Sequence, residues 1–167
     1  MMKKLLSLAT LLLLALSASA QDITGKWKGS FQDEGKTVPF TMTFNAKGTV
    51  TVNITTQDSD PEIGTIHLSV KVGGTYKVTD KVLSVTLNPK KFSAEVTKID
   101  FNNQLKVAIL AQPGMDREVL NMVNEQLRNN TDNMAKDIPF SGDINIKELT
   151  AKKLVLSKDK DTFVLTK

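Results

Sequence analysis

Few residues of this chain have the types and spacing that catalysis requires. The 167 residues include one histidine, His67, and no cysteine. His67 stands between Ile66 and Leu68, so on a strand it points away from the apolar face, together with Thr65 and Ser69. A catalytic triad or a histidine-metal site needs partners that a single outward histidine does not have. We therefore expect a solvated strand residue at this position.

Carboxylates are concentrated in one loop, Asp58-Ser59-Asp60-Pro61-Glu62. Alternating acidic side chains could hold Ca²⁺, but the glycine and glutamate positions of an EF-hand loop are not filled. A solvated hairpin loop is the simpler interpretation. Glu95 is the main carboxylate in the middle of a predicted strand, and a glycosidase needs two acids in one cleft. Gly73-Gly74 lacks the GK[ST] sequence and the following helix of a phosphate loop. We expect no catalytic residue, no bound metal and no cofactor, and hence a protein that is not an enzyme.

Apolar and polar residues alternate along most of the chain after residue 24. This period of two is typical of half-buried antiparallel strands. The clearest segments are residues 26–31, 40–45, 49–55, 65–72, 76–78, 83–87, 92–101, 105–111, 143–149, 153–156 and 162–165. Many short strands predict an all-β sandwich or barrel, and short hairpins between neighbours favour a barrel of about eight to ten strands.

Turn residues separate these segments. Asn45-Ala46-Lys47-Gly48 predicts a hairpin with glycine at positive φ, and tight turns are expected at Thr79-Asp80-Lys81 and Lys158-Asp159-Lys160-Asp161. Asn102-Asn103 predicts a turn between two strands. Gly73-Gly74 is either a two-residue turn or, as we favour, a bulge in one long strand.

One segment, from Asp116 to about Arg128, has the period of an amphipathic helix. Asp116 and Glu118 suit its N-terminus and Arg128 its C-terminus. This helix either closes one mouth of the barrel as a lid or packs against its side wall. Pro113-Gly114 and residues 129–133 could serve as hinges in the first case.

Residues 1–20 have the pattern of a secretory signal peptide. Lys3 and Lys4 precede an apolar run from Leu5 to Leu16, and Ala18-Ser19-Ala20 fits the cleavage site. The run is too short to span a bilayer as a helix, although an uncleaved anchor is the alternative. We expect an exported protein, periplasmic or secreted, with one domain at residues 21–167 and no transmembrane segment in the mature chain.

The charge balance excludes a dedicated nucleic-acid binder. The chain carries a net charge of +4, and the mature part keeps 20 of the 22 basic side chains against 18 acidic ones. Because these charges alternate along the chain, they form no strong electrostatic footprint for DNA or RNA.

The start of the mature chain, Gly25-Lys26-Trp27, resembles the G-x-W signature of lipocalins and the wider calycin barrels. The segment Gly74-Thr75-Tyr76-Lys77-Val78 and the last hairpin are similar to secreted bacterial lipocalin-like domains, and the general resemblance covers nearly all of residues 23–167. It implies an up-and-down barrel in which Trp27 packs across the closed end. The helix stands before the last strands, whereas in the classical members it follows the eighth strand.

Two function classes remain open. The first is non-catalytic binding of a small apolar ligand, such as a lipid, in an internal cavity; the second is a protein-binding or structural barrel with a filled core and an envelope protein partner. The partner surface would then be residues 32–38, residues 57–64 and the exposed helix face. An eight-strand barrel is just wide enough for either case. The candidate pocket residues are Phe40, Met42, Phe44, Val52, Leu68 and Met122.

Overall fold

The structure, a computed structural model, describes residues 22–129, 134 and 138–167. The predicted signal peptide, the expected mature start at Gln21 and most of the predicted hinge at 129–133 lie outside the described residues. Within the described part, no helix has the length and apolar character needed to cross a membrane.

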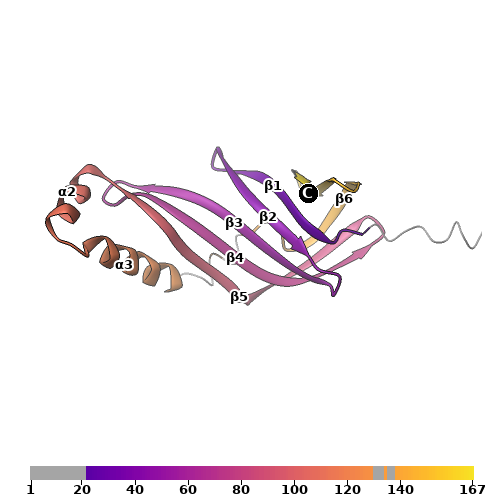
Figure 1. The fold of residues 1–167 in the computed structure, drawn as a ribbon. Coiled ribbons are helices and arrows are strands. Elements are labelled where there is room, and N and C mark those ends of the chain that lie inside the picture. Colours follow the sequence, from indigo (N-terminus) through magenta and orange to yellow (C-terminus); the bar gives the residue numbers. More distant parts are fainter. Residues whose placement is uncertain (1–21, 130–133, 135–137) are drawn as a thin grey trace, which may run out of the picture.

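Eight antiparallel strands close into a barrel in which each strand pairs with its neighbours in the chain and β1 pairs with β8 (Figure 1). The predicted all-β, up-and-down barrel with a helix inserted before the last strands is therefore confirmed. The strands are β1 Gly25–Asp33, β2 Lys36–Phe44, β3 Thr49–Asp60, β4 Gly64–Thr79, β5 Val82–Phe101, β6 Gly142–Leu149, β7 Lys153–Lys158 and β8 Asp161–Thr166.

The hairpin turns lie where their residues predict. Gly48 has φ 75°, and Asp80 and Asp159 have φ 56° and 53° in the turns that follow β4 and β7. Aspartate tolerates this left-handed conformation better than most residues. The predicted bulge is confirmed as well, because β4 runs through Gly73-Gly74 with a register shift between Val72 and Gly74.

Three strands, β3, β4 and β5, extend beyond the barrel. β2 pairs with β3 only as far as Ile54, and β6 pairs with β5 only over Val82–Val85. The remaining residues, 55–60 of β3, 64–72 of β4 and 92–101 of β5, pair with one another and form a three-stranded extension that we call the arm. Figure 1 shows the arm projecting from the barrel toward the two helices.

Two helices follow the arm, α2 Asn103–Ala111 and α3 Met115–Asn129. The predicted helix is confirmed as α3. The predicted strand at residues 105–111 is wrong, because this segment forms α2. Its N-terminus is capped by the side chain of Asn102, which accepts a hydrogen bond from the backbone N–H of Leu105. The short apolar run in α2 fits helix and strand periods equally well, so periodicity alone could not separate them.

The structure has fewer strands than the predicted segments for a second reason, in addition to the helix at residues 105–111. Residues 82–87 and 92–101, predicted as separate strands, belong to one continuous β5. The intervening Asn88-Pro89-Lys90-Lys91 stands opposite Gly73, where the register shifts. The bulge bends the strand pair between barrel and arm without ending either strand.

α3 lies along the arm and not over the barrel. Its one buried residue is Val123, and the side chain of Asn124 accepts a hydrogen bond of 2.9 Å from the backbone N–H of Val96 in β5. Val96 is itself 3% exposed. Of the two predicted placements, neither a lid on the barrel mouth nor a plug against the barrel wall describes this contact, since α3 covers the arm.

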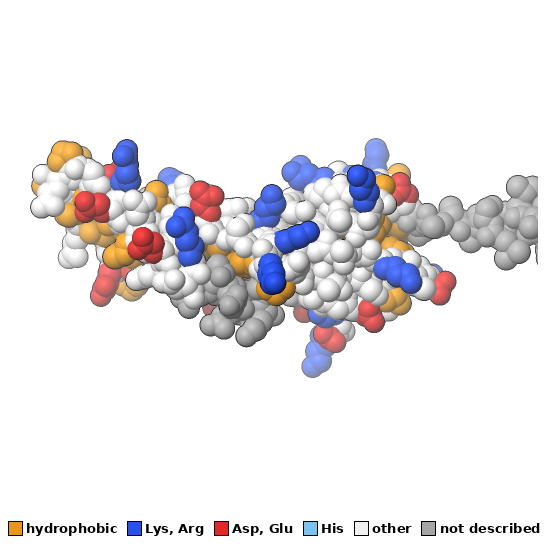
Figure 2. Space-filling model, turned by 90° about the horizontal axis from the view of Figure 1, so that it is seen from below, with side chains coloured by type: hydrophobic (Ala, Val, Ile, Leu, Met, Phe, Trp, Pro, Cys, Tyr) orange, Lys and Arg blue, Asp and Glu red, His pale blue; other side chains and the backbone are white. Residues whose placement is uncertain are grey.

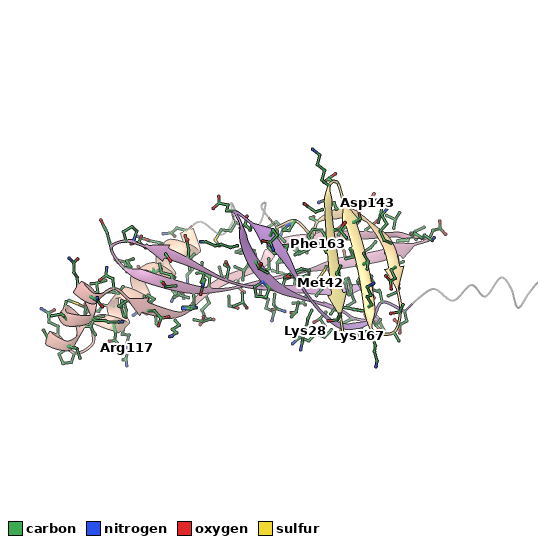
Figure 3. The ribbon with its side chains drawn as sticks, turned by 90° about the horizontal axis from the view of Figure 1, so that it is seen from above. Lys28, Met42, Arg117, Asp143, Phe163 and Lys167 are labelled. Carbon is green, nitrogen blue, oxygen red and sulfur yellow. The ribbon has the colours of Figure 1, made fainter. Side chains whose placement is uncertain are left out.

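One end of the barrel is closed by Trp27. Its side chain is fully buried, its indole N–H donates to the carbonyl oxygen of Ile23 at 2.7 Å, and Lys167 Nζ lies 4.7 Å from the ring centroid. In Figure 3, Lys28 and Lys167 mark this closed end, Phe163 lies toward the opposite end, and Met42 lies between them.

Candidate functional site

The barrel is filled at the end opposite Trp27 by a cluster of four phenylalanines. Phe140 is fully buried, and its ring centroid lies 4.3 Å from that of Phe40, 5.1 Å from Phe163 and 5.8 Å from Phe31. Phe140 precedes β6 and inserts between side chains of β1, β2 and β8. We call these four residues the aromatic plug. They separate the barrel interior from its open mouth.

Four of the predicted pocket residues lie in the packed interior. Phe40, Met42, Phe44 and Val52 are 0–2% exposed and belong to one continuous hydrophobic core. A side chain that lines a ligand-sized void keeps accessible surface on the side of that void, and these side chains keep almost none. Their role in the structure is core packing, since the interior of an eight-strand barrel is narrow enough for side chains to fill.

The other two predicted pocket residues lie elsewhere. Leu68 is on the arm, in register with Val96, and Met122 is on α3 with 49% of its surface exposed. The structure therefore does not bring the six predicted residues into one cavity. Alternation identified the apolar face of each strand, but it could not tell the barrel interior from the face of the arm.

A groove of about 640 Å³ lies above the aromatic plug, where the strands of the barrel diverge. It is open to solvent on one side, and its floor is formed by the first part of the arm. The walls come from the β1–β2 hairpin, from the start of β8 and from the segment before β6. The lining residues are Phe31, Gln32, Asp33, Val38, Ile54, Thr56, Val70, Met134, Ile138, Pro139, Asp161, Thr162 and Phe163.

The apolar part of the groove is continuous with the core. Val38, Ile54 and Val70 are 4–8% exposed, and Ile138 covers them from the segment before β6 at 8%. The volume falls within the range of about 300–1,000 Å³ that is usual for small-molecule sites. The arrangement can bury part of an apolar molecule against a preformed surface.

Two carboxylates stand at the rim of the groove. The register of β1 and β8 pairs Lys28 with Thr166. Counting outward from this pair along the two strands brings Phe31 level with Phe163 and Asp33 level with Asp161. Because the strands diverge at this end and Phe140 fits between them, the side chains face a common opening.

The lysines nearest in register to these carboxylates bind other groups. Lys36, opposite Asp33, lies 3.4 Å from Asp58 Oδ1. Lys158, opposite Asp161, donates to the carbonyl oxygens of Pro139 at 3.3 Å and Ser141 at 2.6 Å. Among the residues that the structure describes, Asp33 and Asp161 have no ion-pair partner, and no lysine, arginine or histidine lines the groove.

Sequence reasoning missed most of the groove. None of its lining residues is among the six predicted pocket residues, although Gln32, Asp33 and Val38 belong to the predicted partner surface at residues 32–38. Phe163, Asp33 and Asp161 carried a usable signal: their equal distances from the β1–β8 pair place them level once that pairing is known. Ile138 and Pro139 carried none, because their position depends on how the segment before β6 enters the barrel.

The residues considered for catalysis and metal binding, His67 and the acidic loop, form hydrogen bonds and ion pairs within the fold. His67 lies on β4 with its side chain partly exposed, and its Nε2 lies 2.7 Å from Asp100 Oδ2, a carboxylate partner that the sequence did not predict. Asp100 also lies 2.7 Å from Lys98 Nζ. In the acidic loop, Asp60 Oδ1 accepts hydrogen bonds from the backbone N–H groups of Glu62 and Ile63. The described ranges contain no group of three or more potential metal ligands.

Comparisons with known proteins add no functional assignment. No family model and no curated protein match the chain, so membership of the lipocalin-like family stays a prediction. A solved structure of an uncharacterized protein from Bacteroides eggerthii DSM 20697 is similar over 87% of this chain and 99% of that chain, with 21% sequence identity and a TM-score of 0.45. A likeness at this level carries no argument, and function must be argued from the groove itself.

Proposed function

We propose that the protein binds a small, largely apolar molecule, such as a lipid, without chemically changing it, and that the groove at the barrel mouth is the binding site. The observation that carries this proposal is a preformed apolar concavity of about 640 Å³ resting on a rigid core. Binding would bury apolar ligand surface against Phe31, Phe163 and Ile54, which supplies the affinity. The site differs from the internal cavity that the sequence suggested, because side chains fill the barrel interior and the groove lies outside the aromatic plug.

The proposal fits the rest of the expected biology. A lipocalin-like barrel exported by a signal peptide is suited to carry or sequester an apolar molecule in the periplasm or outside the cell. Catalysis is not part of the proposal. Of the residues that line the groove within the described ranges, none forms a nucleophile and base pair.

The test measures the binding of a neutral apolar dye, N-phenyl-1-naphthylamine, to the unchanged protein, to a variant in which the groove is filled, and to a control variant. Thr56 is a half-buried groove residue on β3, and its neighbour Thr55 is exposed on the opposite face of the same strand. We expect Thr56→Trp to weaken dye binding about tenfold or more, because the indole occupies the concavity. Thr55→Trp should leave dye binding unchanged. Equal dye affinity in all three folded proteins would sink the proposal.

A second candidate function, binding of an envelope protein partner, is favoured by a different observation. On α2, Val107 and Leu110 are 68% and 84% exposed, and no residue of that helix is buried. Figure 2 shows hydrophobic side chains at the helical end of the molecule, where basic and acidic side chains are interspersed with them. Exposed apolar clusters of this kind mark contact surfaces more often than bare solvent faces.

A photo-cross-linking amino acid at position 110 tests this candidate in cells. Its control is the same amino acid at position 117, an exposed polar site at the start of α3. One discrete adduct at 110 that is absent at 117 would support a protein partner. Identical patterns at both positions would argue against it.

A further inference from the structure

We infer that the ligand of the groove is an amphiphile with a positively charged end, whose apolar body lies over the aromatic plug and whose cationic group lies between Asp33 and Asp161. This inference rests on the proposed function and specifies its substrate class.

The charge of the groove is one-sided. Among its described lining residues there are two carboxylates and no cationic side chain. Both carboxylates are solvent-exposed at the ends of β1 and β8, level with each other across the divergence of these strands. A cationic group placed in this opening is attracted by both carboxylates, whereas an anionic headgroup at the same place is repelled by them.

Two described lysines that stand opposite these carboxylates in register are bound to other groups. Lys36 is directed to Asp58, and Lys158 is directed to the backbone of the segment before β6. The second contact has a further effect, because it ties β7 to Pro139 and so helps to hold one wall of the groove. Within the described residues, neither lysine forms an ion pair with Asp33 or Asp161.

The polar and apolar parts of the groove are arranged for an amphiphile. Phe31 lies two residues before Asp33 on β1, and Phe163 lies two residues after Asp161 on β8, so each strand presents an aromatic ring below a carboxylate. Gln32 and Thr162 stand between them. An alkyl chain that enters past the carboxylates therefore meets the rings of the aromatic plug, while its charged end stays at the solvent boundary.

The experiment displaces N-phenyl-1-naphthylamine with three compounds that carry one ten-carbon chain and differ in its end group: decyltrimethylammonium, decanol and decanoate. We expect decyltrimethylammonium to bind about tenfold more tightly than decanoate, with decanol between them. Raising the salt concentration should lower the affinity of decyltrimethylammonium relative to that of decanol, because salt screens the charges of exposed carboxylates.

Two variants locate the effect. Asp33→Asn with Asp161→Asn should lower the affinity for decyltrimethylammonium about tenfold and leave that for decanol unchanged, consistent with about threefold for each exposed charge pair. Asp80→Asn is the control. Asp80 lies in the turn between β4 and β5 at φ 56°, a conformation that asparagine also adopts, and it is not a groove residue.

The outcomes separate the two proposals. If decanol displaces the dye but the three headgroups bind alike, or the double variant leaves the cation's affinity unchanged, the inference fails and the proposed function stands. If decanoate binds most tightly, the groove prefers an anionic headgroup and the inference fails. If no compound displaces the dye and Thr56→Trp binds it like the unchanged protein, both fail.

Discussion

At the scale of single residues, the clearest electrostatic feature is the contact of Asp100 with Lys98 and His67 on the outer face of the arm. Two hydrogen bonds, a larger effect from Lys98 and a smaller one from His67, hold the pKa of Asp100 below its ordinary value of 3.8. The folded protein therefore binds the proton of this carboxyl less readily than the unfolded chain does. The stabilisation is present above pH 3.8 and is lost as the pH falls through the lower pKa of the folded state.

Asp100→Asn should remove this contribution to acid sensitivity. We expect the variant to be less stable than the unchanged protein near neutral pH, with the difference shrinking as the pH falls from about 5 to about 2. Urea denaturation across this pH range measures it, and Asp80→Asn serves as the control because its turn makes no such ion pair. A stability difference that stays constant with pH would contradict the assignment.

At the scale of elements, the junction between barrel and arm depends on a glycine pair in β4. A Cβ on Gly74 would collide with the carbonyl oxygen of Thr86 and the Cα of Leu87, which are backbone atoms of the paired strand. A Cβ on Gly73 would instead meet the flexible side chain of Lys91 at 3.2 Å. Only Gly74 is therefore required for the close approach of β4 and β5 at this bend.

This contrast predicts unequal effects of one methyl group. Gly74→Ala should destabilise the protein by about 1–3 kcal/mol, because the strands must move apart. Gly73→Ala should destabilise the protein by less than about 1 kcal/mol, because Lys91 Cδ can rotate away and only Lys91 Cβ, at 3.3 Å, must shift slightly. Chemical denaturation of both variants gives the comparison. Equal effects would mean that the bend does not depend on the approach at Gly74.

At the scale of the whole molecule, a packed barrel is joined to an arm with a thinner cover. The barrel core includes Trp27, Met42, Leu83, Leu154 and Leu165, each fully buried. On the arm, α3 buries Val123 alone and is tied to β5 through Asn124. Regions with few buried apolar contacts open locally at a lower free energy than the global unfolding of the domain.

Amide hydrogen exchange should therefore be faster in α3 than in the strands of the barrel. We expect the amides of residues 119–127 to exchange before those of β1, β2 and β7. Asn124→Ala should speed exchange in α3 by about two- to tenfold, since it leaves the N–H of Val96 without its acceptor. Asn121→Ala, at an exposed position of the same helix, is the matched control. Protection of α3 equal to that of the barrel strands would contradict this division.

The sequence by itself determined the barrel, most of its turns and α3. These features depend on local periodicity and on turn residues such as Gly48, Asp80 and Asp159, which act through their own backbone. The same local rules failed for α2, because its short apolar run fits two periods and Asn102, which caps the helix locally, was interpreted as part of a turn between two strands.

Only the tertiary structure decided where a ligand could bind. Alternation shows that Phe40, Met42, Phe44 and Val52 face inward, but whether inward-facing side chains meet or leave a void depends on strand divergence and on what enters between them. Here Phe140 enters from a segment without strand periodicity and completes the plug. The concavity is thereby placed at the mouth, between residues far apart in the chain whose proximity follows from the closure of β1 on β8.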